Sequence, residues 1–271
     1  MQNRPIGVFD SGVGGLTILK ALRRELPHEH LIYFGDTANV PYGGKSKQAV
    51  TKLALAVARF LENCQVKLVV VACNTASAQA LPALQKQLQV PVVGVIGPGA
   101  DAAVAATHNH HVAVLGTQGT VESKAYVKAI SKRDKKARVF QQACPLFVPL
   151  AEEGFAKKPA AELIAREYLA PVLKSGADTV ILGCTHYPIL KNLIARIMGP
   201  NVELVDSADT LARAVHSFLI TKHLARTSGC GGVKLYASDA PDKFTRSAQK
   251  LLGGKVPRAI LKKLTYENLH R

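Results

Sequence analysis

The stretch of sequence that decides the fold runs from residue 179 to residue 188 and reads Thr179-Val180-Ile181-Leu182-Gly183-Cys184-Thr185-His186-Tyr187-Pro188. It is an apolar run that ends at glycine, followed by small polar residues and then by an amphipathic segment. This order is typical of a buried strand that turns into a helix. In an open α/β sheet such a turn lies at the carboxyl edge of the strands, where ligands bind. Cys184 and His186 are therefore predicted to lie where chemistry is usually done.

The same pattern occurs earlier in the chain, in Leu68-Val69-Val70-Val71-Ala72-Cys73-Asn74-Thr75-Ala76-Ser77. Cys73 and Cys184 thus occupy equivalent positions in two strand-turn-helix units. A polar turn precedes each cysteine at a similar interval, beginning at Asp10 in the first half and at Thr117 in the second. We interpret the chain as two similar α/β units that face each other, with the two thiols on opposite sides of a shared cleft.

The rest of the pattern also predicts an α/β protein. Apolar runs typical of strands, near residues 5–9, 31–34, 92–96, 112–115 and 202–205, alternate with segments of helical periodicity. Such alternation predicts parallel sheets with helices on both faces.

The composition is that of a globular protein and excludes several classes. Of the 271 residues, 48% are hydrophobic, and Arg4 and Asp10 interrupt the N-terminus before a signal sequence can build. The most apolar region, residues 90–107, is too short and too broken by proline and glycine to span a membrane. We expect a cytoplasmic protein. The five cysteines show no C-x-x-C spacing, which favours free thiols over a disulfide framework or a zinc site, and we expect no metal.

The charge balance is strongly basic, with 35 lysines and arginines against 19 aspartates and glutamates. Such a charge attracts small anions and favours solubility, or it indicates nucleic-acid binding. Aromatic residues make up only 6% of the chain and tryptophan is absent from it, so the stacking surfaces that single-strand binders use are scarce. We place nucleic acid well behind small-molecule chemistry.

Two matched thiols indicate a particular kind of reaction. A thiol acts as an acid or a base when its surroundings set its pKa near the working pH, and a helix N-terminus lowers that pKa. Two such groups on opposite faces of one ligand suit a reaction that removes a proton from one side and returns one to the other, which inverts a stereocentre. A lone cysteine is more often inert packing, and we apply that interpretation to Cys64, Cys144 and Cys230.

The neighbouring polar residues have both structural and functional interpretations. His186 is placed to polarise Cys184 or to hold a substrate group. Asp10 either assists on the Cys73 side or only caps the following helix. Hydroxyl, amide and backbone N–H donors at helix starts form a natural seat for carboxylates, and they come from Ser11, Asn74, Thr75 and Thr185.

Together these motifs resemble those of the aspartate/glutamate racemase family. The resemblance rests on five ordered segments: residues 10–17 (DSGVGGLT), 35–38 (GDTA), 41–43 (PYG), 72–76 (ACNTA) and 183–188 (GCTHYP). It implies interconversion of L- and D-glutamate without a cofactor, which supplies D-glutamate for peptidoglycan. Racemisation of aspartate or of a broader set of amino acids stays open as an alternative.

The resemblance also implies roles for particular residues. Cys73 and Cys184 would be the two acid/base thiols, assisted by Asp10 and His186, with Glu152 a further candidate. The substrate would be held by Ser11, Tyr42, Gly43, Asn74, Thr75 and Thr185, and touched by Thr117 and Thr120. Asp10 and His186 are also candidate substrate-binding residues.

The family fold implied is two flavodoxin-like α/β domains across a central active-site cleft, usually in a homodimer. The first domain would comprise residues 1–97 and 207–271, and the second residues 98–206.

Two other functions remain open from the residues alone. A cysteine hydrolase would use Cys184 with His186, form a covalent acyl intermediate and have no need of Cys73. A nucleic-acid-binding module would use the basic surface, and its affinity would fall steeply with salt.

Overall fold

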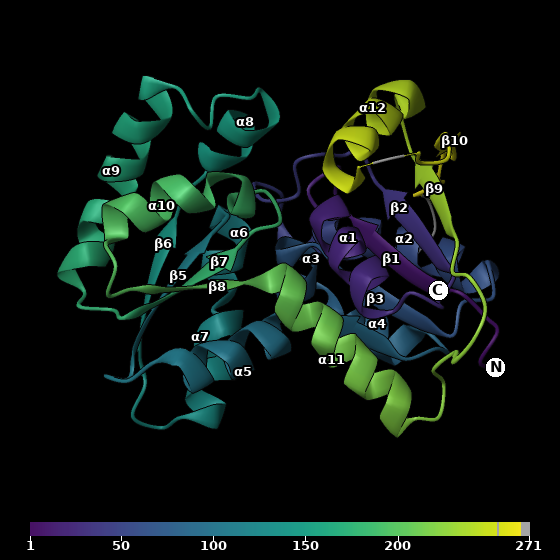
Figure 1. Ribbon diagram of the computed structural model, residues 1–271, viewed down its shortest axis with the longest axis horizontal. Coiled ribbons are helices and arrows are strands. Elements are labelled where there is room, and N and C mark those ends of the chain that lie inside the picture. The colour runs from purple at the N-terminus through teal and green to yellow at the C-terminus, as the bar shows by residue number, and fades with distance from the viewer. Residues whose placement is uncertain (254, 267–271) are drawn as a thin grey trace.

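The structure is a computed structural model that describes residues 1–253 and 255–266. It contains two parallel sheets, each covered by helices, with the chain crossing between them twice (Figure 1). The first sheet has the order β10-β9-β2-β1-β3-β4 and the second has the order β6-β5-β7-β8. The prediction of an α/β fold with two parallel sheets is confirmed.

The strands of the first sheet are β1 (Ile6–Asp10), β2 (Leu31–Gly35), β3 (Leu68–Val71), β4 (Val92–Gly94), β9 (Val233–Ala237) and β10 (Ile260–Leu261). Those of the second sheet are β5 (His111–Gly116), β6 (Arg138–Ala143), β7 (Thr179–Gly183) and β8 (Glu203–Asp206). The helices in chain order are α1 (Leu16–Glu25), α2 (Lys47–Asn63), α3 (Asn74–Gln79), α4 (Leu81–Gln87), α5 (Ile96–Ala106), α6 (Gln118–Ser123), α7 (Ala125–Arg133), α8 (Phe147–Glu152), α9 (Pro159–Lys174), the 3-10 turn η1 (Tyr187–Leu190), α10 (Lys191–Met198), α11 (Ser207–Thr221) and α12 (Pro241–Leu252).

The two sheets repeat one topology. Within each half, the first strand lies between the second and the third, giving β2-β1-β3-β4 and β6-β5-β7-β8. This is the order of the doubly wound flavodoxin-like fold, which places ligands at the carboxyl ends of the first and third strands, where the strand order reverses. The internal similarity of the two halves thus has a counterpart in strand order.

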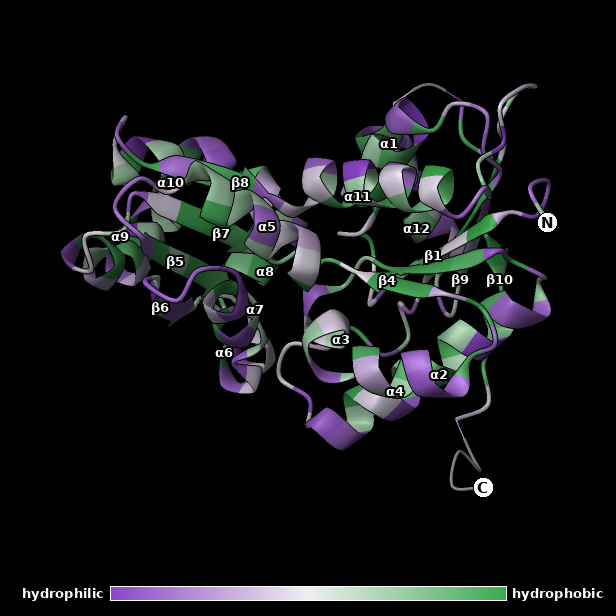
Figure 2. Ribbon diagram, turned by 90° about the horizontal axis from the view of Figure 1, so that it is seen from below, coloured by the Kyte–Doolittle hydropathy of each residue, from purple (hydrophilic) through white to green (hydrophobic). Residues whose placement is uncertain are grey.

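The central strands are apolar on both faces because helices cover both sides of each sheet. Every residue of β1, β3 and β7 is buried, as expected for parallel strands. Figure 2 shows these strands as hydrophobic ribbons between helices whose outer faces are polar. Burial of these continuous apolar runs is the main stabilising contribution to both halves.

One hydrophobic core extends through both halves. It joins side chains of the first sheet, such as Val8, to side chains of the second, such as Ile181, through helices α5 and α11. Helix α11 packs against α1 of the first half and α5 of the crossover, and it runs between the two halves in Figure 1. The halves are therefore packed against each other and not merely tethered.

The expected domain limits can be located on these elements. The limit at residues 97 and 98 falls inside α5, and the limit at residues 206 and 207 falls at the start of α11. Residues 254 and 267–271 of the expected first domain lie outside the described residues. The division into domains stays a prediction.

Two local details differ from the pattern in the sequence. The amphipathic segment after Cys184 begins as the 3-10 turn η1, and the α-helix starts only at Lys191. Pro188 has no backbone N–H to donate. It is tolerated because it lies in the first turn, where that N–H would have no partner within the helix. The final helix is followed by the short strand β10, which the sequence pattern did not predict.

Among the residues that the structure describes, no helix is both long enough and apolar enough to cross a membrane.

Candidate active site

The site lies where the carboxyl ends of four strands meet. Cys73 follows β3, Ser11 follows β1, and Thr117 and Cys184 follow the matching strands β5 and β7 of the other half. Each half thus contributes the end of its first strand and the end of its third. Because the two switch points face each other, side chains that are far apart in the sequence share one space.

These residues line one small cavity. Its walls hold ten of the residues expected from the sequence, namely Ser11, Tyr42, Gly43, Cys73, Asn74, Thr75, Thr117, Cys184, Thr185 and His186. They also hold Val40, Pro41 and Val148, which the sequence analysis missed. Nothing in the local pattern marks those apolar residues as site residues, since only the tertiary fold brings them there.

Three expected residues lie outside this cavity. Asp10 is fully buried behind it, and Thr120 is fully buried beneath Thr117. Glu152 lies behind His186 and lines a neighbouring cavity. Each of the three contacts a residue that lines the cavity, namely Thr185, Thr117 and His186 respectively.

Cys73 lies in surroundings that favour the neutral thiol. It is the N-cap of α3, and its Sγ accepts a hydrogen bond from the N–H of Ala76 at 3.4 Å. The hydrogen bond at the start of α3 lowers the pKa of this thiol, as expected, but larger causes outweigh it. Burial raises the pKa of Cys73, the negative charge of Asp10 raises it further, and the one backbone hydrogen bond is too weak to reverse this.

Cys184 has a different partner. No α-helix begins directly after it, and its Sγ lies 3.8 Å from His186 Nδ1. The other ring nitrogen, Nε2, lies 2.9 Å from Glu152 Oε1. Burial lowers the pKa of His186, but the hydrogen bonds to Cys184 and Glu152 outweigh it and raise the pKa to about 10. His186 therefore carries a positive charge at neutral pH.

Asp10 combines the two roles considered for it. Its Oδ2 accepts hydrogen bonds from the N–H groups of Gly12 at 3.1 Å and Gly15 at 3.0 Å, which orders the turn before α1. Its Oδ1 is 3.5 Å from the hydroxyl of Thr185 in the other half. The carboxylate is thus a structural cap whose charge also acts on Cys73.

Hydroxyl and amide groups complete the polar part of the site. Thr75 Oγ1 lies 2.8 Å from Thr117 Oγ1, which in turn lies 3.0 Å from Thr120 Oγ1. The Oδ1 of Asn74 accepts a hydrogen bond from Tyr126, while its buried Nδ2 has no partner among the described residues. A buried donor without a partner is costly, so Asn74 offers a hydrogen bond that a ligand in the cavity can accept.

Two glycines allow the halves to approach closely. A Cβ atom on Gly14 would collide with the Thr185 hydroxyl and lie 2.8 Å from the ring of His186. A Cβ atom on Gly43 would lie 2.7 Å from the Cβ of Thr117. Glycine is required at both positions because the facing half fills the space where a side chain would stand.

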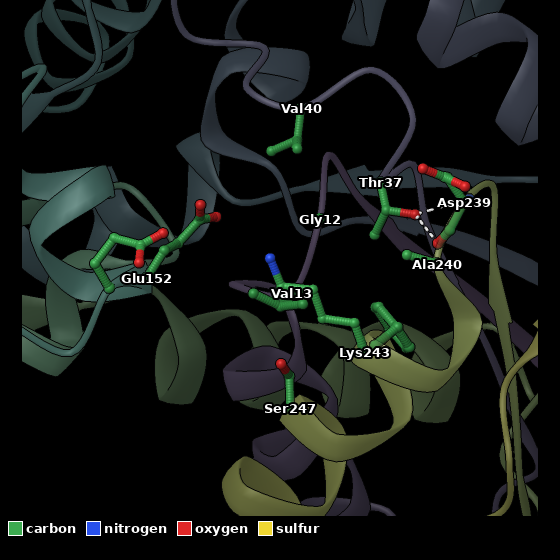
Figure 3. Close-up of a pocket in the computed structure, with 11 residues that line it drawn as sticks. Gly12, Val13, Thr37, Val40, Glu152, Asp239, Ala240, Lys243 and Ser247 are labelled. Carbon is green, nitrogen blue, oxygen red and sulfur yellow. Dashed lines mark hydrogen bonds between the residues drawn. The ribbon is translucent and has the colours of Figure 1, made fainter.

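The neighbouring cavity lies between α8 and α12 and shares Val40 with the site (Figure 3). Lys243 extends into it from α12, and Glu152 lines it from the other half. The hydrogen bond from His186 is the main cause that lowers the pKa of Glu152, and the charge of Lys243 adds to it. Within residues 1–253 and 255–266, no three His, Cys, Asp or Glu side chains are grouped so that they could hold a metal ion.

Two facing α/β halves thus place one cysteine each at a shared cavity. Residues 14–215 match the family described as Asp/Glu/Hydantoin racemase, and the chain belongs to this family.

Individual relatives are similar over nearly the whole chain. Glutamate racemase from Geobacter metallireducens is 52% identical over 257 residues, which cover 94% of this chain and 95% of that protein. A glutamate racemase isoform from Bacillus anthracis has a similar structure, with a TM-score of 0.94, 35% identity, and coverage of 97% of this chain and 98% of the other. Glutamate racemase from Francisella tularensis, solved in complex with D-glutamate, is similar with a TM-score of 0.91 and 38% identity. The similarity covers 98% of this chain and 99% of that one.

Proposed function

We propose that this protein interconverts L- and D-glutamate without a cofactor and supplies D-glutamate for peptidoglycan synthesis. The single observation that carries this proposal is that Cys73 and Cys184, from equivalent positions in two facing sheets, line the same small cavity. The names of the relatives support glutamate as the substrate.

The proposed reaction needs one thiolate and one thiol. The thiolate takes the proton from the α-carbon of glutamate, leaving a carbanion, and the opposite thiol donates its own proton to the other face of that carbon. One C–H bond breaks and one forms, one S–H bond forms and one breaks, and no electrons are gained or lost overall. Burial and Asp10 raise the pKa of Cys73 and so favour the neutral thiol there, while His186, 3.8 Å from the Cys184 sulfur, places a positive charge on the other side of the cavity.

The roles of the remaining residues belong to the same proposal. His186 and Glu152 stabilise charge on the Cys184 side, and Asp10 acts on the Cys73 side. The substrate is held by donors on the cavity walls, contributed by Ser11, Tyr42, Gly43, Asn74, Thr75, Thr117 and Thr185, with Thr120 ordering Thr117. The unpartnered Nδ2 of Asn74 and the N–H groups after β1 and β3 suit the carboxylates of glutamate.

The test measures two signals in D2O, namely circular dichroism for racemisation and NMR for loss of the α-proton. Cys73→Ser and Cys184→Ser should each abolish racemisation in both directions. Each variant should still exchange the α-proton of one enantiomer, and the two variants should act on opposite enantiomers, because the remaining thiol reaches only one face of the carbon. Full racemisation by either variant would refute the proposal. Assaying aspartate in parallel tests the choice of substrate.

The geometry of Cys184, His186 and Glu152 also suits a cysteine hydrolase. His186 would be the base beside the thiol, and the Glu152 carboxylate would orient the imidazole ring. That activity would leave Cys73→Ser fully active and would produce an acyl-enzyme that intact-mass measurement detects. We expect neither result.

A homodimer is part of the proposal and follows from the family resemblance. Light scattering coupled to size-exclusion chromatography tests it directly.

A further inference from the structure

A buried carboxylate lies next to the site without lining it. Asp36 follows β2 and is fully buried. It accepts hydrogen bonds from Tyr42 Oη at 2.6 Å, Ser238 Oγ at 2.7 Å and Tyr266 Oη at 2.9 Å. The Nδ2 of Asn39 lies 3.0 and 3.1 Å from its two oxygens. Both oxygens of Asp36 therefore accept hydrogen bonds.

All of these donors are neutral. Burying a carboxylate is costly unless hydrogen bonds replace the water it loses, and here hydroxyl and amide groups do so, with no Lys, Arg or His of the described residues forming an ion pair with Asp36. Removing one donor leaves a buried charge less satisfied, which costs more than the loss of an ordinary hydrogen bond. The arrangement therefore holds its partners in one geometry.

The partners of Asp36 come from three separate segments. Asn39 and Tyr42 belong to the segment of residues 36–44, which we call the substrate loop because its residues 40–43 line the cavity. Ser238 follows β9, and Tyr266 lies beyond β10. Asp36 thus ties a wall of the site to the C-terminal part of the chain.

Further bonds attach the loop to the segment after β9. The N–H of Ala38 donates to Ser238 Oγ at 2.9 Å. Thr37 Oγ1 donates to the carbonyl of Asp239 at 2.6 Å and accepts from its N–H at 2.9 Å (Figure 3). At its other end the loop meets the second half, where the N–H of Gly119 donates to the carbonyl of Gly43 at 2.9 Å.

The hydrogen bond from Tyr42 limits what this residue can do for a ligand. The phenol of Tyr42 has a single O–H group, and it donates this hydrogen bond to Asp36. Burial and the charge of Asp36 raise the pKa of Tyr42 well above its usual range, so the phenol stays protonated. Tyr42 therefore contributes its ring and backbone to the cavity, and the loop must be placed correctly for that backbone to be useful.

We propose that Asp36 and Tyr266 are positioning residues that fix the substrate loop, so that the C-terminal part of the chain controls how tightly the site binds its substrate. This inference rests on the proposed function. Because the loop forms a wall of the cavity and carries neither thiol, its displacement weakens ground-state and transition-state binding alike. Such a loss raises KM and leaves kcat nearly unchanged.

The experiment uses the full chain and two tyrosine-to-phenylalanine substitutions. Tyr266→Phe removes one hydroxyl that donates to Asp36 and accepts from Asn39. We expect it to raise KM for L- and D-glutamate by roughly tenfold, with kcat within about twofold of the wild type. The matched control is Tyr236→Phe, because Tyr236 lies on β9 and packs on Phe60, and its hydroxyl is not among the described groups that hydrogen-bond to Asp36. Its kinetics should match those of the wild type.

Asp36→Asn should raise KM further, because an amide cannot accept all the hydrogen bonds that the carboxylate accepts. If this variant does not fold, Tyr266→Phe still decides the question. Unchanged KM in Tyr266→Phe, or a loss confined to kcat, overturns the positioning role. The proposed function fails separately, when the wild-type protein does not racemise glutamate at all.

Discussion

At the scale of single residues, the two cysteines show how one sequence pattern can produce two chemical environments. Both follow a buried strand and both line the same cavity. Cys73 is next to the negative charge of Asp10, whereas Cys184 is next to the positive charge of His186. The equivalence of the two positions and the neighbours Asp10 and His186 were predictable from the sequence. The hydrogen bond between His186 and Glu152 was not, because Glu152 comes from a distant part of the chain.

The raised pKa of His186 predicts the pH dependence. His186 has a pKa of about 10 in the folded protein and 6.5 in an unfolded chain. Its contribution to the free energy of unfolding is therefore complete below pH 6.5 and is lost as the pH rises through 10. We expect kcat/KM to fall over the same upper range. Glu152→Gln removes one cause of the raised pKa, so the fall should begin at lower pH. A pH–rate profile of kcat/KM measures this.

The control for this substitution is Glu153→Gln, which changes the charge equally one residue away without touching His186. Its profile should match that of the wild type. An unshifted profile in Glu152→Gln would show that Glu152 does not set the proton affinity of the histidine.

Gly14→Ala should reduce kcat while leaving the fold intact. The added methyl group would displace Thr185 and His186, which lie directly against Gly14. A displacement of about 1 Å at a reacting group can cost on the order of 100-fold in rate. Gly97→Ala is the control, since a Cβ atom there would meet only the end of the Arg133 side chain, at 3.6 Å, among the described residues. Steady-state kinetics and circular dichroism of both variants test the prediction, and a fully active Gly14→Ala would contradict it.

At the scale of elements, a buried ion pair fastens the ends of several segments of the first half. Lys67, just before β3, lies 2.8 and 2.6 Å from the two carboxylate oxygens of Glu29, just before β2. Its Nζ also donates to the carbonyls of Gln2 and Leu224. The pair therefore joins the N-terminal residues and the segment after α11 to the amino-terminal ends of strands β2 and β3.

Lys67→Met should destabilise the fold strongly, because it leaves the buried charge of Glu29 without its partner. Breaking a buried pair in this way costs about 3–5 kcal/mol, which urea unfolding measures. Lys20→Met removes an exposed lysine from α1 and should change the free energy of unfolding by less than about 0.5 kcal/mol. Equal effects of the two substitutions would show that the pair contributes nothing of its own.

The elements themselves were largely predictable from the sequence. Apolar runs such as residues 68–71 and 179–182, each followed by small polar residues, mark strands and the turns that hold the site. Ten of the expected site residues do line one cavity. The hydrogen-bonded cluster around Asp36 was not predictable, because Ser238 and Tyr266 lie some 200 residues further along the chain. Strand β10 was missed as well, since a two-residue strand leaves no period to detect.

At the scale of the whole molecule, the shared core predicts cooperative unfolding. Helices α5 and α11 bury apolar side chains that belong to one cluster with both sheets. Neither half can therefore unfold without exposing side chains of this shared cluster in the other. We expect a single calorimetric transition in which the van't Hoff and calorimetric enthalpies agree.

A fragment of residues 98–206 provides the complementary measurement. Separated from α11 and the first sheet, it should lack native circular dichroism and should expose its apolar face. Two separate transitions in the whole protein, or a stably folded fragment, would contradict the shared core.

The unlike surroundings of the two sulfurs have a further consequence for repeated turnover. In each conversion the thiolate gains a proton and the opposite thiol loses one. The enzyme that releases the product therefore differs from the one that bound the substrate in which of the two sulfurs carries the proton. Burial and Asp10 make the form with a charged Cys73 the less populated one. Enantiomers have equal free energies, so kcat/KM must be the same in both directions. The separate values of kcat and KM need not be equal in the two directions. The less populated form must exchange protons and return to the other form before the next molecule of the same enantiomer can react. At high substrate concentration that relaxation, and not the cleavage of a C–H bond, would then limit the flux.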